Sequence, residues 1–159
     1  MNFVKQQNQI VARVVAVLAS ICLAVLCVLV MVGVVMRYVF DNAPDYVEPV
    51  GLLLVLVVAF MGAALKVRDG GHIGLDSLVS KLPPKGQVVL KAFQQLSMIA
   101  FAIAMCYGSK QMAMTTFDDQ IPILGLPEAI RYLIPFVAGI CTILFCIEHL
   151  LALIARKRT

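Results

Sequence analysis

The sequence predicts an all-α integral membrane protein with four transmembrane helices. Four long apolar segments dominate the 159 residues, and hydrophobic residues make up 62% of the chain against 14% charged ones. Globular domains are closer to roughly half apolar and a quarter charged. Backbone groups in lipid must be satisfied within the segment, so each crossing should be a helix. We expect one membrane domain over residues 1–159, with spans at about 14–36, 47–67, 90–112 and 128–154.

The first span contains no Asp, Glu, Lys, Arg or His between residues 14 and 36. A helix needs about 20 apolar residues to cross a hydrocarbon core of roughly 30 Å, so this segment is long enough to span alone. It exceeds the roughly 7–15-residue apolar core of a cleaved secretion signal, and no convincing small-x-small cleavage site follows it. We therefore interpret it as a permanent helix.

Turn residues predict the limits of the second helix. Asp45 and Glu48 have the spacing of a capping box, and Pro49 suits only a first helical turn. The helix should therefore begin near residues 46–49. It should end before Gly70-Gly71, which cannot readily continue a helix.

Proline also marks the starts of the last two helices. Pro83-Pro84 closes the preceding segment, so the third helix should start after Gly86. Pro127-Glu128 suits the beginning of the fourth, because proline lacks an amide donor and glutamate favours the positive helix end.

The loop between the second and third spans has a helical pattern of its own. Apolar residues repeat at helical spacing, and polar residues take the opposite face. The apolar positions are Leu75, Leu78, Val79 and Leu82, and the polar ones are Asp76, Ser80 and Lys81. We favour a short amphipathic helix in the cytoplasmic interface, near anionic phospholipid headgroups. The alternative is a packed cytoplasmic turn without lipid contact.

Basic residues are sorted by loop. Ten of the thirteen lie before the first span, between the second and third, or after the fourth: Lys5, Arg13, Lys66, Arg68, Lys81, Lys85, Lys91, Arg156, Lys157 and Arg158. The two other loops carry Asp41, Asp45, Glu48, Asp118, Asp119 and Glu128. The positive-inside rule therefore predicts both termini in the cytoplasm and two acidic loops outside. The net charge of +4 does not indicate nucleic acid as a partner.

Ionisable residues inside spans often mark transport pathways, and here they are scarce. Glu148 and His149 lie near the cytoplasmic end of the fourth span. Counted from Ile130, Glu148 lies about 27 Å along a helix, which is the inner interface and not the midplane. We interpret the two as an interfacial pair near Arg156 and Lys157, and a proton relay is the alternative.

Small residues recur at every fourth position in two spans. Ala100, Ala104 and Gly108 do so in the third, and Ala59 and Ala63 in the second. This spacing lets helices approach closely in lipid. The contact could lie within the bundle or with another subunit, and the sequence leaves both open.

Several motifs occur in an order typical of one family. Residues 37–42 read RYVFDN, and residues 62–76 read GAALKVRDGGHIGLD, a stretch that contains Arg68, His72 and Asp76. Residues 124–127, LGLP, then precede the fourth apolar segment. In this order the chain resembles the DctQ family, the small membrane subunit of tripartite ATP-independent periplasmic (TRAP) transporters. The family usually has an acidic pair before a leucine at the second helix, whereas this chain offers only Glu48.

The resemblance implies a non-catalytic subunit without cofactors. Its partners would be a large membrane subunit of the DctM type and a periplasmic binding protein of the DctP type. Phospholipid is a further expected partner, on the ground of the predicted interfacial helix. Such transporters import an organic acid, such as sialic acid or a C4-dicarboxylate, by sodium symport across the bacterial inner membrane. The candidate contacts with partner or lipid are Arg37, Asp41, Glu48, Arg68, His72, Asp76, Ala100, Ala104, Gly108, Asp118 and Asp119.

Two other function classes remain as alternatives. A stand-alone transporter of the small multidrug type has an essential acidic residue in its first helix, which residues 14–36 lack. An anchor subunit of a redox complex would need paired histidines within helices to ligate haem. This chain has only His72, in a loop, and His149, at a helix end. Its five cysteines show no metal-ligand spacing, so we expect no metal or other cofactor.

Overall fold

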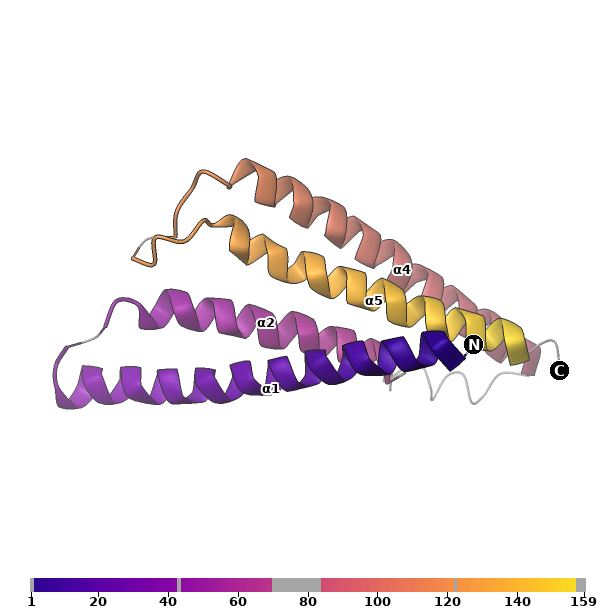
Figure 1. The fold of residues 1–159 in the computed structure, drawn as a ribbon, viewed down its shortest axis with the longest axis horizontal. Coiled ribbons are helices and arrows are strands. Elements are labelled where there is room, and N and C mark those ends of the chain that lie inside the picture. Colours follow the sequence, from indigo (N-terminus) through magenta and orange to yellow (C-terminus); the bar gives the residue numbers. More distant parts are fainter. Residues whose placement is uncertain (1, 43, 70–83, 122, 157–159) are drawn as a thin grey trace.

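The computed structural model describes residues 2–42, 44–69, 84–121 and 123–156. This part of the chain forms four helices: α1 (Asn2–Val39), α2 (Val47–Arg68), α4 (Pro84–Thr115) and α5 (Ala129–Arg156) (Figure 1). Each contains a stretch long and apolar enough to cross a membrane, which confirms the predicted fold class. The predicted interfacial helix lies in residues 70–83, outside the described residues.

The helices form two hairpins, α1–α2 and α4–α5, that converge at one end and separate toward the other (Figure 1). We name the convergent end, where the two chain termini lie, the terminal end. The opposite end, which carries residues 40–46 and 116–128, is the loop end. In the described part of the chain, α5 packs against α4, α2 and, more sparsely, α1, whereas α4 touches neither α1 nor α2. Helix α5 therefore holds the two hairpins together.

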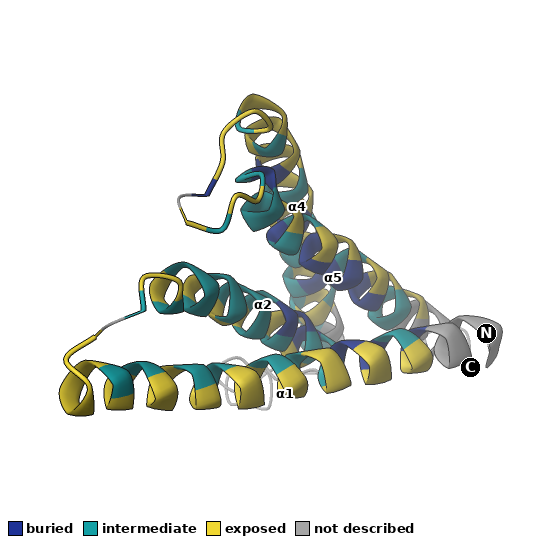
Figure 2. Ribbon diagram, turned by 60° about the vertical axis from the view of Figure 1, so that its left-hand side comes forward, coloured by how far each residue is buried: buried dark blue, intermediate teal, exposed yellow. Residues whose placement is uncertain are grey.

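The buried core is small and lies on the inner faces of α1, α2 and α5 (Figure 2). Phe145 is fully buried and packs in one cluster with Ala12, Ala64 and Ala138. Buried residues make up 33% of the most apolar stretch of α5 but only 6% of that of α1. Most large apolar side chains of α1 thus face outward, as expected where lipid replaces water as the solvent.

The start of α2 differs from the predicted capping box. The helix begins at Val47, and its N-cap residue is Tyr46, which makes no side-chain cap hydrogen bond. Asp45 lies one residue too early to fill the cap position. The backbone closes the turn instead, because the Val47 amide donates to the carbonyl of Pro44 at 3.2 Å. The capping-box prediction is therefore wrong, although Pro49 does fall in the first helical turn.

Helix α4 begins earlier than predicted, at Pro84 and not after Gly86. A proline fits the first helical position, because its missing amide would be unsatisfied there in any case. Helix α5 begins at Ala129, directly after Pro127-Glu128, and continues through Pro135.

The second loop at the loop end is a compact turn. The Ile121 amide donates to the Leu126 carbonyl at 2.8 Å, and the Gly125 amide donates to the Ile121 carbonyl at 3.2 Å. Gly125 has φ +64°, a left-handed conformation that glycine adopts without steric cost. Ile121 is only 1% exposed, so it anchors the turn.

Candidate interaction surface

Two side-chain contacts tie three helices together at the terminal end. Asn8 on α1 donates from Nδ2 to Oε2 of Glu148 on α5, at 2.7 Å. His149 on α5 has Nε2 at 2.7 Å from the backbone carbonyl oxygen of Arg68 at the end of α2. A carbonyl oxygen only accepts, so Nε2 is the donor. Glu148 and His149 thus bind different helices, an arrangement that favours a packing role over a proton relay.

Three predicted site residues lie exposed around the first loop of the loop end: Arg37, Asp41 and Glu48. Arg37 and Glu48 line a cavity of about 740 Å³ together with Asp45 and, from the second loop, Ile123. The cavity therefore brings residues of both loops together. Arg37 makes no ion pair with these carboxylates, and Glu128–Arg131, at 3.0 Å, is the one ion pair among the described residues.

The small-residue positions face away from the bundle. These exposed residues are Ala59, Ala63, Ala100, Ala104 and Gly108. A side-chain carbon added at Gly108 would meet no atom within 4 Å. Helix α4 packs on α5 through a different face, where Ala102 is 0% exposed. Neither stripe is therefore buried against another helix within the described bundle.

The remaining predicted residues fall into three groups. Arg68 is half-buried at the end of α2, where its carbonyl accepts from His149. Asp118 and Asp119 are exposed in the second loop. His72 and Asp76 lie outside the described residues.

Close packing between α4 and α5 depends on Gly139, which the sequence prediction missed. A side-chain carbon at this position would lie 2.5 Å from Cys106 Sγ and 3.3 Å from the carbonyl oxygen of Ala102. The only sequence signal for this contact was a lone glycine in the fourth apolar segment. Glycine is common where membrane helices approach closely, so Gly139 could have predicted a close helix contact in this segment.

Comparisons with known proteins agree on one family. Residues 26–156 match the model of the DctQ component of tripartite ATP-independent periplasmic transporters. A TRAP transporter small permease protein of Haemophilus influenzae is 32% identical over 132 residues, which cover 83% of this chain and 82% of that protein. A second protein of that description, from the same organism, is 22% identical over 123 residues, or 77% of this chain and 74% of its own length.

The match decides among the three function classes that the sequence had left open. It supports a transporter component and not a redox anchor or a stand-alone multidrug transporter. Together with the four apolar helices, it makes the protein a multi-pass component of the bacterial inner membrane. The chain belongs to the DctQ family and is a small permease subunit of a TRAP transporter.

Proposed function

We propose that this subunit is a non-catalytic scaffold for a large membrane subunit of the DctM type. The complex would import an organic acid with a sodium gradient, after a periplasmic DctP-type protein delivers the substrate. Family membership supports this role, and so does the lack of charged side chains near the middle of the described spans. Transport chemistry in a membrane usually needs such charges.

The outward-facing small residues of α4 carry the proposal. Ala100, Ala104 and Gly108 leave the helix backbone accessible along one face. Lipid chains gain little from such a face, whereas a second helix gains close van der Waals contact. We assign this face to the large subunit.

For orientation, we propose that the loop end faces the periplasm. The distribution of basic residues supports this assignment. Asp41, Glu48, Asp118 and Asp119 would then be available to the binding protein, and the Arg68–Asp76 segment would face the cytoplasm.

The test is coexpression with the cognate large subunit. Ala104→Leu widens the proposed contact face, and Ala24→Leu makes the same change at an exposed position on α1. We expect Ala104→Leu to reduce both copurification and uptake by at least about tenfold, whereas Ala24→Leu should behave like the parent. Helicity and membrane content of each variant provide the folding control.

Two results would contradict the assignment. In one, Ala104→Leu copurifies and transports like the parent. In the other, the loss is confined to Ala24→Leu, which would move the contact to α1.

A further inference from the structure

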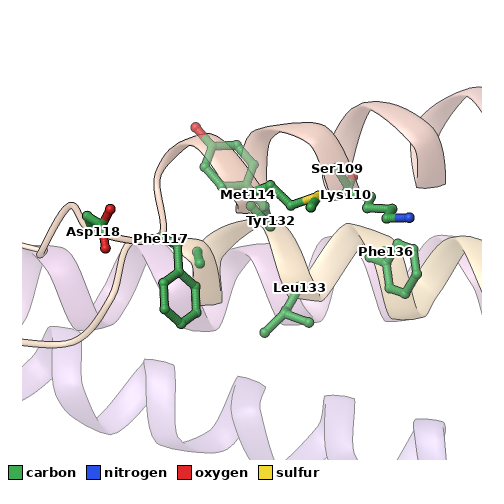
Figure 3. A pocket seen from close by; sticks show the side chains of 10 residues that line it. Ser109, Lys110, Met114, Phe117, Asp118, Tyr132, Leu133 and Phe136 are labelled. Atoms are coloured by element: carbon green, nitrogen blue, oxygen red, sulfur yellow. The ribbon is translucent and has the colours of Figure 1, made fainter.

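A groove of about 510 Å³ runs between α4 and α5 at the loop end. This volume is within the range of roughly 300–1,000 Å³ typical of ligand sites. Its walls are apolar and aromatic: Met114 and Phe117 come from α4 and the residues just after it, and Tyr132, Leu133 and Phe136 come from α5 (Figure 3). Two charged residues, Lys110 and Asp118, also line it, and they lie toward opposite ends of the groove (Figure 3).

Lys110 is exposed within the membrane-spanning stretch of α4, Val89–Thr115. It makes no hydrogen bond or ion pair with any other described residue, Asp118 included. Lys91 and Lys110 are separated by roughly 28 Å along a helix, close to the hydrocarbon thickness of roughly 30 Å. With Lys91 at one interface, Lys110 therefore lies near the lipid phosphates of the leaflet at the loop end.

An unpaired ammonium at that depth is costly unless it meets water or an anion. Asp118 follows the end of α4 at Thr115, so it lies farther out toward the aqueous phase than Lys110. The groove thus presents a cation on its membrane side and an anion on its aqueous side. A zwitterionic headgroup has its phosphate nearer the acyl chains and its ammonium farther out, which is the complementary order.

We propose that this groove binds a phospholipid with a phosphoethanolamine headgroup from the leaflet at the loop end. The phosphate accepts from the Lys110 ammonium, and the lipid ammonium donates to the Asp118 carboxylate. Tyr132, Leu133 and Phe136 pack against the glycerol and the first methylene groups of an acyl chain.

The position of the groove favours lipid over a protein partner. At about 100° per residue, Lys110 lies roughly 120° around α4 from Ala104. A subunit seated on the small-residue face therefore leaves the groove open to the bilayer. The inference does not depend on the transport role, because it rests on the groove and its two charges.

The test uses the full chain in complex with its large subunit, reconstituted in vesicles that contain a photoreactive phosphatidylethanolamine. We expect cross-links in residues 109–118 and 129–136, competed by unlabelled phosphatidylethanolamine but not by phosphatidylglycerol. Lys110→Gln and Asp118→Asn should each lower the labelling about tenfold, as expected for loss of a hydrogen bond between charged groups. Lys91→Gln and Asp119→Asn change the same residue types outside the groove and should leave labelling unchanged.

Ala113→Phe fills the groove without altering its charges. If a charge variant fails to fold, this variant still tests whether the lipid binds in the groove. Loss of labelling in this variant supports the site, and retained labelling overturns it. Equal labelling by all lipid classes in the parent also overturns it. So does labelling that appears only when the large subunit is absent, because the groove would then be a protein contact.

Discussion

The Nδ2 atom of Asn8 lies 2.7 Å from Oε2 of Glu148, and this hydrogen bond joins the start of α1 to the end of α5. Asn8 also donates to the Leu144 carbonyl at 3.3 Å and is itself only 6% exposed. The two helices otherwise share few contacts in the described bundle. These polar atoms therefore act together with the apolar cluster of Ala12 and Phe145 in fixing where α1 crosses α5.

Replacing Asn8 with alanine should destabilise the subunit by about 1–3 kcal/mol, because a partly buried carboxylate loses its donor. Thermal unfolding of the purified protein in one detergent would measure the change. Asn42→Ala, at an exposed loop position, is the matched control. Equal melting temperatures for the two variants would show that the Asn8 contact carries little stability.

Gly139→Ala should weaken the α4–α5 hairpin. The added carbon would meet Cys106 Sγ at 2.5 Å and the Ala102 carbonyl oxygen at 3.3 Å, so a helix or a side chain must shift. Such overpacking costs about 1–3 kcal/mol. Gly62→Ala has open space around it and should be neutral or raise stability by up to about 1 kcal/mol through helix propensity. Unfolding temperatures that fail to separate the two variants would contradict the close packing at Gly139.

Single cysteines should report the orientation. We expect a membrane-impermeant thiol reagent, added to intact cells from the periplasm, to label Ala43→Cys and Asp119→Cys but not Ser80→Cys or Thr159→Cys. Permeabilised cells should show labelling at all four positions, which controls for reactivity. Periplasmic labelling of Ser80→Cys would overturn the orientation derived from the basic residues.

Charge reversal at the loop end should slow delivery by the binding protein. Asp45 and Asp119 are exposed, and neither lines the α4–α5 groove, so Asp45→Lys with Asp119→Lys changes the surface charge and leaves the groove intact. Uptake should fall at low binding-protein concentration and recover with excess. The defect should shrink with added salt, because exposed charges are screened over about 8–10 Å near physiological ionic strength. Unchanged uptake throughout that titration would leave the acidic loops as solvated surface.

The spans could be predicted from the sequence because long apolar runs have a single stable form in lipid. Which helix faces pack could not, because lipid-facing and protein-facing surfaces are equally apolar. From the sequence, the small residues Ala100, Ala104 and Gly108 were candidates for packing inside the bundle. In the structure they are exposed, whereas Gly139 lies at the close contact between α4 and α5. The Asn8–Glu148 contact joins residues 140 positions apart, and no local pattern links them. Asp45 and Glu48 have the spacing of a capping box, but no capping box forms. The turn before α2 is closed by the backbone hydrogen bond from the Val47 amide to the Pro44 carbonyl.

The separation of the two hairpins toward the loop end gives the subunit an outline that widens along the helix axes, from the terminal end to the loop end (Figure 1). Its cross-sectional area therefore differs between the two leaflets. The cluster around Phe145 and the Asn8 hydrogen bonds hold the narrow end, whereas the wide end has fewer such contacts. A change in the lateral pressure of the loop-end leaflet would thus act first on the spacing of the hairpins, with α5 as the pivot.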